Sequence, residues 1–251
     1  IYPGAIDASG DGADQDCGGT QDPEPHVGLA FGSLASLQTA IDSAPENVTV
    51  WVGPGTYLEH RLSFRGKPLH LESTHGAALT VIDAGAQDAV MVFEGGEQRT
   101  SVVRGFTLTN GAALQGGGIY IADSSPWLEQ LVIRNNVAIG DPGQGGGLYL
   151  RGSSAMVMNC NLSNNRIDVG NGAGIYLEQS APTLQATTLT GNRTNAGDGG
   201  GLYMAASLLT LTDSLVTQNE AAGGGGGIAM VEASEASILD SRIEGNRLSN
   251  G

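Results

Sequence analysis

From Gly116 to the C-terminus the chain repeats one short pattern five times. Each copy contains a glycine cluster, an apolar–X–apolar strand and, 18 or 19 residues after the third glycine, an asparagine. The third glycines are Gly118, Gly147, Gly174, Gly201 and Gly227, and the asparagines are Asn136, Asn165, Asn192, Asn219 and Asn246. A spacing of 26–29 residues between copies is typical of solenoids, in which each unit stacks on its neighbours to bury its apolar face.

Residues 33–44, well before the repeat, predict a short amphipathic α-helix with Ser33 as its N-cap. Its apolar stripe consists of Leu34, Leu37, Ile41 and Ala44. Pro45 follows at the point where a helix should stop. We expect this helix to cover the first coil of the solenoid, where unpaired strand edges would otherwise invite association.

Short apolar segments follow one another from residue 48 onward, and helical runs of ten or more residues are absent after residue 44. Three short strands per turn of about 25 residues predict an all-β fold, a single-stranded right-handed parallel β-helix with an N-terminal capping helix. We expect roughly eight coils, a domain spanning residues 28–251, and regular coils over residues 116–251.

The chain is acidic, with a net charge of -15 over 251 residues. Residues 1–60 hold nine Asp and Glu and no Lys or Arg. Such a surface repels nucleic acid and anionic membranes and favours cation binding, so no nucleic-acid partner is expected. No stretch approaches the ~20 apolar residues of a membrane span. Since the sequence begins without Met or a signal peptide, we expect Ile1 to be a processed terminus.

Residues 1–27 form an acidic segment rich in Asp and Gly. Its carboxylates at Asp7, Asp11, Asp14 and Asp16 are spaced around glycines. A short flexible loop of this kind supplies the oxygen ligands that Ca²⁺ prefers, although the acid at position 12 of an EF-hand loop is missing. A solvated acidic tail is the alternative.

The stretch YPGAIDASGDGADQDCGG in this segment resembles metal-binding motifs in secreted proteins of myxobacteria and their relatives. It departs from them at Gly18 and Gly19, where a further Asp often follows the cysteine. The resemblance implies an exported bacterial protein that is extracellular or on the cell surface.

A wider resemblance covers residues 33–251. The segments SLQTAIDSA, VWVGPGTYLE, TVIDAG and VVRGFTLTNGAALQGGGIY are similar to the start of right-handed parallel β-helix proteins of the pectate-lyase-like superfamily. The later Gly-Gly-X-Ile/Leu and X-X-Asn repeats resemble those of polymorphic outer-membrane proteins. The resemblance implies the fold more than the function, because this fold carries lyases, hydrolases, adhesins and stalks.

Stacked coils place equivalent residues about 4.8 Å apart. The asparagines then form a ladder of hydrogen-bonded amides, and the glycines permit positive φ or a close approach of coils. One register of aromatic residues points outward between inward-facing Ile and Leu, namely Tyr120, Tyr149, Tyr176 and Tyr203. This stripe either contacts carbohydrate, stabilises the stack or packs under a loop.

The sequence predicts one further column and one further strand face. Glu220 lies between Arg193 and Arg247 and is expected to form an ion-pair column worth about 0–1 kcal/mol per exposed pair. Met156, Met158, Cys160 and Leu162 alternate along one strand and are expected to share its face. We expect Cys160 to be a buried thiol, not a partner in a disulfide with Cys17.

Reactive residues are scarce in the regular coils, which contain no His and no Lys. The best catalytic candidates are His60, Lys67 and His70, near Glu59 and Glu72, and exposed polar strand residues explain them equally well. We therefore expect an exported, non-catalytic β-helix protein that serves as a cell-surface stalk, adhesin or filament-forming module. The alternative is a carbohydrate-active enzyme, either a polysaccharide lyase or a glycoside hydrolase.

The chain stops at Asn250–Gly251 without a capping element. An open β end needs a cover. We expect either a longer native chain or self-association through the open C-terminal coil, with surface glycans as the other candidate partner.

Overall fold

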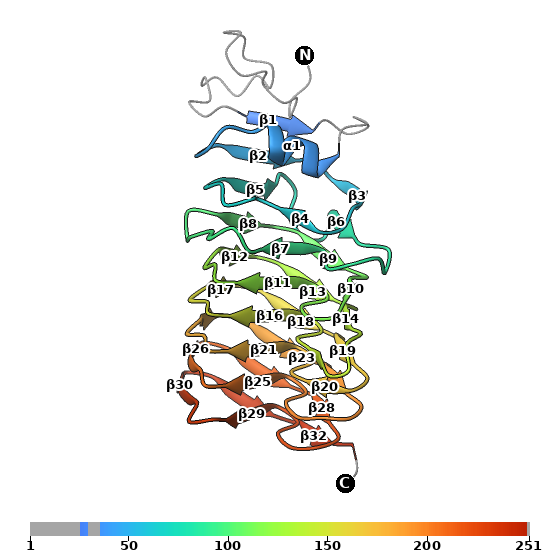
Figure 1. Ribbon diagram of the computed structural model, residues 1–251, viewed down its shortest axis with the longest axis vertical. Helices are drawn as coiled ribbons and strands as arrows, with labels where there is room; N and C mark the ends of the chain where they lie inside the picture. The colour runs from blue at the N-terminus through green and yellow to red at the C-terminus, as the bar shows by residue number, and fades with distance from the viewer. Residues whose placement is uncertain (1–25, 30–35, 250–251) are drawn as a thin grey trace.

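The computed structural model describes residues 26–29 and 36–249. Over these residues the chain winds into a parallel β-solenoid whose coils stack from the N-terminal to the C-terminal end (Figure 1). Strands pair in parallel with the equivalent strands of the neighbouring coils, as Tyr149 does with Tyr120 and Tyr176. The predicted all-β parallel β-helix is confirmed. Asp7, Asp11, Asp14 and Asp16 lie outside the described residues, so Ca²⁺ binding there stays a prediction.

Within the described residues, four long sheets run along the solenoid, and a two-stranded sheet lies beside them. The chain visits sheet I, then sheet II, then sheet III in each coil, and from β10 onward it adds a short strand of sheet IV between II and III. The expectation of three strands per turn is therefore right for the early coils and incomplete for the regular ones.

Sheet I comprises β1 (His26–Leu29), β2 (Thr49–Val52), β5 (His70–Ser73), β8 (Val102–Arg104), β12 (Trp127–Glu129), β17 (Met156–Met158), β22 (Thr183–Gln185), β26 (Leu208–Thr212) and β30 (Glu235–Leu239). Sheet II comprises β3 (Gly55–Leu58), β6 (Thr80–Asp83), β9 (Thr107–Thr109), β13 (Val132–Arg134), β18 (Asn161–Ser163), β23 (Thr188–Thr190), β27 (Leu215–Thr217) and β31 (Arg242–Glu244).

Sheet III comprises β4 (Leu62–Ser63), β7 (Met91–Phe93), β11 (Ile119–Ala122), β16 (Leu148–Arg151), β21 (Ile175–Glu178), β25 (Leu202–Ala205) and β29 (Ile228–Val231). Sheet IV comprises β10 (Ala112–Ala113), β14 (Val137–Ala138), β19 (Arg166–Ile167), β24 (Arg193–Thr194), β28 (Glu220–Ala221) and β32 (Arg247–Leu248). The two-stranded sheet pairs β15 (Gly143–Gln144) with β20 (Gly170–Asn171).

The core fills the inside of the coils. Alternation along each strand sends every second side chain inward, so Ile119 and Ile121 of β11 are fully buried while Tyr120 between them lies on the outer side. Equivalent Leu, Ile and Val residues of successive coils stack into one continuous apolar cluster. This cluster is the main source of stability, because no coil could bury its apolar side chains alone.

Single residues with positive φ turn the chain at the corners of the coils. The corner between sheets I and II has Gln130, Asn159, Ala186, Asp213 and Asp240 in the left-handed region, with φ between 49° and 53°. At the next corner the residue before the ladder asparagine does the same, at Asn135, Asn164, Gly191, Gln218 and Gly245. These two corners therefore each turn on one left-handed residue in place of a loop, which keeps the coils in register.

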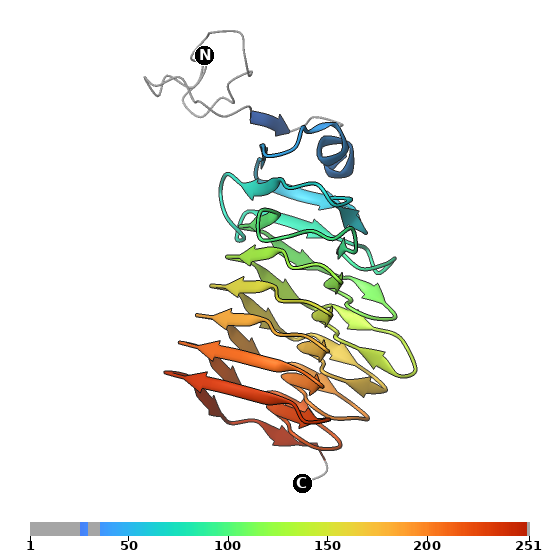
Figure 2. The ribbon, with the colours of Figure 1, turned by 60° about the vertical axis from the view of Figure 1, so that its left-hand side comes forward.

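Helix α1 (Leu37–Ser43) packs at the N-terminal end of the solenoid (Figures 1 and 2), where Leu37, Ala40 and Ile41 join the core cluster. The expected capping helix is confirmed, but its start is not at Ser33. Ser36 is the N-cap, and its hydroxyl accepts a hydrogen bond from the Thr39 N–H. The prediction missed this because Ser33 and Ser36 are equally good capping residues.

The asparagine ladder is buried at four of its five positions. Asn192, which is fully buried, donates its side-chain amide to Asn219 Oδ1 at 3.0 Å and to Leu162 O at 2.9 Å. Its own Oδ1 accepts from the backbone and side-chain N–H groups of Asn165, both at 3.0 Å. The same pattern links Asn136 to Asn165 and Asn219 to Asn246. The predicted ladder is confirmed.

The glycine clusters provide both the positive φ and the close approach of coils that were expected of them. The first glycine of each cluster has φ between +58° and +68°. The third lies against the next coil, because a Cβ at Gly174 would collide with the Gly201 carbonyl oxygen and press on the Asn192 amide.

The expected face of β17 is wrong. Val157 is the residue that points into the core, whereas Met156 and Met158 lie on the outer side and are partly exposed. Asn159 turns the chain with φ 53°, so Cys160 re-enters the interior in a new phase. Cys160 is a free, buried thiol, as expected.

Apolar side chains of the last described coil are exposed, among them Ile238, Leu239, Ile243 and Leu248. Self-association through this coil stays a prediction.

Candidate ligand-binding site

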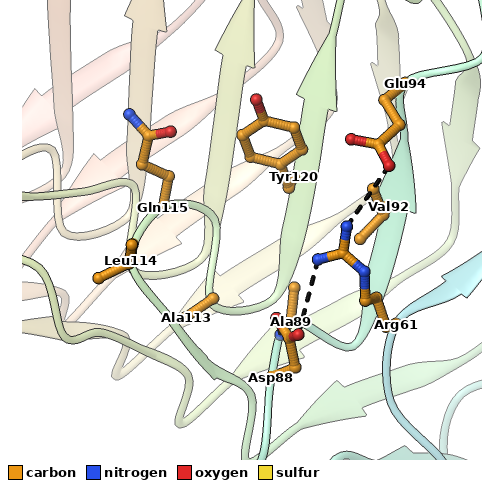
Figure 3. A pocket seen from close by; sticks show the side chains of 9 residues that line it. All are labelled: Arg61, Asp88, Ala89, Val92, Glu94, Ala113, Leu114, Gln115 and Tyr120. Atoms are coloured by element: carbon orange, nitrogen blue, oxygen red, sulfur yellow. Dashed lines mark hydrogen bonds and ion pairs between the residues drawn. The ribbon is translucent and has the colours of Figure 1, made fainter.

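A pocket of about 380 Å³ opens on the outer side of sheet III, where the regular repeat begins. Residues from three successive coils line it, namely Arg61, Asp88, Ala89, Val92, Glu94, Ala113, Leu114, Gln115 and Tyr120. Figure 3 shows Tyr120 between Gln115 and the Arg61–Glu94 pair, with Asp88 on the other side of the guanidinium group. The site therefore combines one aromatic ring with charged and amide groups.

Tyr120 is the first ring of an aromatic column on the outer side of sheet III. Its ring stacks on Tyr149 with centroids 5.3 Å apart and an interplanar angle of 8°. The column continues through Tyr176 and Tyr203, at centroid distances of 5.5 and 5.0 Å. Before Tyr120 the same register holds Val92. Because a small side chain replaces the ring there, the pocket lies beside the face of Tyr120 that Tyr149 does not cover.

The charges of the pocket centre on Arg61. Its guanidinium group lies 3.6 Å from an Asp88 carboxylate oxygen and 3.4 Å from a Glu94 oxygen. The Arg61 backbone N–H donates to Ala89 O at 2.6 Å, which ties the turn that carries Arg61 to the next coil. Two carboxylates and one guanidinium group give the pocket a formal charge of −1. Both hydrogen-bond donors and acceptors therefore line it.

The inner rings of the column are less accessible than its ends. Tyr149 and Tyr176 are 1% and 7% exposed, while Tyr120 and Tyr203 are partly exposed. The Tyr149 hydroxyl donates to Glu178 at 2.6 Å. Burial and this hydrogen bond raise the pKa of Tyr149, and burial, with the nearby Tyr203 and Glu178, raises the pKa of Tyr176 to about 12. Although all four rings lie on the outer side of the sheet, only the two end rings of the column are accessible to a ligand within the described residues.

The three catalytic candidates have separate surroundings. The Lys67 Nζ donates to the carbonyl oxygens of Ile41, Asp42 and Ala44 at 2.7–3.1 Å, at the C-terminal end of α1. Glu59 accepts from the Leu37 and Gln38 backbone N–H groups at the other end. These positions complement the helix dipole. Stabilisation of the capping helix therefore explains why Lys67 and Glu59 lie where they do.

His70 and His60 lie away from the helix. The His70 Nδ1 is 3.4 Å from Glu72, which also pairs with Arg104 at 3.2 Å, and Arg104 in turn pairs with Glu129 at 2.8 Å. This network lies on the outer side of sheet I. His60 is exposed in the turn before β4. Catalysis by these residues stays a prediction.

The expected ion-pair column is present on sheet IV. Glu220 lies 3.6 Å from Arg193 and 2.6 Å from Arg247, its partners in the parallel register. Glu220 itself is 8% exposed, so it is screened less than its two arginines.

Sequence reasoning missed the charged half of the pocket. Arg61 lies far from Asp88 and Glu94 in the sequence, and the three residues share no repeat position. The one sequence feature that they share is their place in the irregular coils. That feature does not show that the three side chains lie close together.

A second pocket, of about 360 Å³, lies along sheets II and IV and is lined by Leu58, Asp83, Gly85, Ala86, Asn110, Gly111, Ala112, Asn135 and Val137. Its one side-chain pair joins the Asn110 amide to Asp83 at 2.9 Å. It lacks an aromatic ring and an arginine, so it offers less for recognition.

Within residues 26–29 and 36–249, no helix is long and apolar enough to span a membrane. No curated protein and no solved structure gave a significant match. A family model described as periplasmic copper-binding protein (NosD) matches residues 52–251, about four fifths of the chain. The match covers the coils that form the pocket and the whole regular repeat, and on this evidence the chain belongs to the NosD family.

Proposed function

We propose that this chain is an exported, non-catalytic β-helix protein that binds a glycan in the pocket beside Tyr120 and acts as a surface adhesin or stalk. The observation that carries the proposal is the open ring face of Tyr120 next to the Arg61–Asp88–Glu94 cluster. Apolar faces of sugar rings pack on aromatic rings, while convergent polar groups bind the hydroxyls. The periplasmic description of the family supports export.

The charge of the pocket favours a neutral sugar or an amino sugar. One guanidinium group stands against two carboxylates, and the chain carries a net charge of -15. Both features disfavour polyuronates and other anionic glycans. The expected ligand is therefore a neutral hexose or an amino sugar within a longer glycan.

The position of Arg61 argues against a glycosidase at this site. Retaining and inverting glycosidases place the scissile bond between two carboxyl groups. Here the guanidinium group of Arg61 occupies the space between Asp88 and Glu94 (Figure 3). Binding without turnover is the better account of this arrangement.

A glycan array followed by calorimetric titration tests the proposal. Tyr120→Ala removes the platform and is expected to weaken binding of the best glycan at least tenfold, which corresponds to about 1.4 kcal/mol. Tyr203→Ala is the matched control, because Tyr203 ends the same column on the side away from the pocket. Binding that survives Tyr120→Ala unchanged, or release of reducing sugar from the glycan, would contradict the proposal.

The family description also names copper. Within residues 26–29 and 36–249, no group of three or more His, Cys, Asp and Glu side chains is placed to hold a metal ion.

A further inference from the structure

The pocket beside Tyr120 has two ends of different chemistry. On one side of the ring lies the Arg61–Asp88–Glu94 cluster, which we call the charged end. On the other side lies what we call the amide end, formed by Ala113, Leu114 and Gln115 (Figure 3). A sugar ring stacked on Tyr120 therefore directs substituents on its opposite edges into different surroundings.

Hydrogen bonds fix the direction of the Gln115 amide. The Gln115 Nε2 donates to the Gln144 Oε1, and the Gln144 side chain is itself hydrogen-bonded to the Tyr176 side chain. Gln115 therefore turns its nitrogen to Gln144 and its oxygen toward Tyr120, as Figure 3 shows. Because an amide oxygen is an acceptor, the amide end offers a ligand an acceptor that is held in place by the next coil.

Apolar side chains lie next to this acceptor. Leu114 is 69% exposed, Ala113 is partly exposed, and both line the pocket. Among the described residues that line the pocket, the charged side chains all belong to the other end. A hydroxyl group directed to the amide end would leave the Leu114 side chain in water, whereas a substituent that carries a methyl group would cover it.

An acetamido group matches this combination. Its N–H is a donor for the Gln115 oxygen, and its methyl group gains by contact with Leu114. A free ammonium group would gain less at this end, because it would lose water beside an apolar side chain and would meet no carboxylate among the described lining residues.

We propose that the pocket binds an N-acetylated sugar, with the ring on Tyr120, the acetamido N–H on the Gln115 Oε1 and the methyl group on Leu114. This inference rests on the proposed glycan-binding function. It narrows the ligand from neutral and amino sugars in general to 2-acetamido sugars.

A glycan array with matched sets of oligosaccharides, followed by calorimetric titration, tests the inference. Within each set the members differ only at C2, which carries an acetamido, a hydroxyl or a free amino group. One set is chitotetraose, cellotetraose and the fully deacetylated tetramer, and the other is built in the same way on galactose. We expect the acetamido member of at least one set to bind roughly tenfold more tightly than its two counterparts.

Leu114→Ser and Gln115→Leu should each reduce this preference to about threefold or less, because each removes one of the two contacts. Leu208→Ser is the matched control, since Leu208 is an exposed leucine on sheet I, away from the pocket. It should keep the full preference. Circular dichroism should show that all three variants keep the parent's fold.

Two kinds of failure can be told apart. Glycan binding in which the acetamido member has no advantage, or an advantage that survives both pocket variants, would overturn this inference and leave the proposed function standing. Absence of binding to every glycan of the array would overturn the proposed function, and this inference with it.

Discussion

At the residue scale, the asparagines give the repeat its strongest local constraint. Asn192 makes four hydrogen bonds with its side chain and has no exposed surface. No other small side chain offers two donors and an acceptor in this geometry. The ladder therefore explains why an asparagine recurs at this position in every regular coil.

Asn192→Ala is expected to lower the free energy of unfolding by about 2–4 kcal/mol, because it leaves the Asn165 backbone N–H buried without an acceptor. Urea denaturation followed by circular dichroism measures the change. Asn195→Ala serves as the control, since Asn195 is exposed and bonds Asp168 at the surface. It should change the free energy by no more than about 0.5 kcal/mol. Equal effects of the two substitutions would show that the ladder is not the stabilising feature.

Residue roles outside the ladder were harder to predict. Lys67 is a catalytic candidate in the sequence, with Glu59 close by, and only the fold shows the two residues at opposite ends of α1. The face of β17 was mispredicted because a corner residue, Asn159, interrupts the alternation that the sequence otherwise follows. A period-2 pattern cannot show where a single left-handed residue resets its phase.

At the element scale, parallel pairing places residues that are one repeat apart above one another, so that they form columns along the solenoid. The tyrosines, asparagines and the Arg193–Glu220–Arg247 group could all be aligned from the repeat, because every coil keeps the same register. The burial of Tyr149 and Tyr176 could not be predicted, because each ring is stacked between two others and Tyr176 also contacts the Gln144 side chain, which lies outside the main strands.

The tyrosine column predicts a loss of stability at alkaline pH. The pKa of Tyr176 is about 12 in the folded chain, against the usual 10.0 in the unfolded chain. Its contribution is thus fully present below pH 10 and falls as the pH rises toward 12, because the unfolded state loses its proton first. Absorbance at 295 nm should show a late-titrating tyrosine that Tyr176→Phe removes. Loss of a step near pH 10 in that variant would refute the assignment.

At the scale of the whole molecule, the residues that we propose bind a glycan lie in the irregular early coils and at the start of the regular repeat. Arg61, Asp88 and Glu94 belong to the early coils, and Tyr120 opens the repeat. Val92 takes the place of a ring in the register before Tyr120 and lines the pocket. A sugar ring bound there would extend the column by one further ring.

The most direct measurement is a crystal structure of the chain with its best array glycan. The account predicts a sugar ring stacked on the free face of Tyr120, with its hydroxyls bonded to Arg61 and to Asp88 or Glu94. A glycan bound at the pocket of sheets II and IV, or on sheet I, with the Tyr120 pocket empty would contradict it.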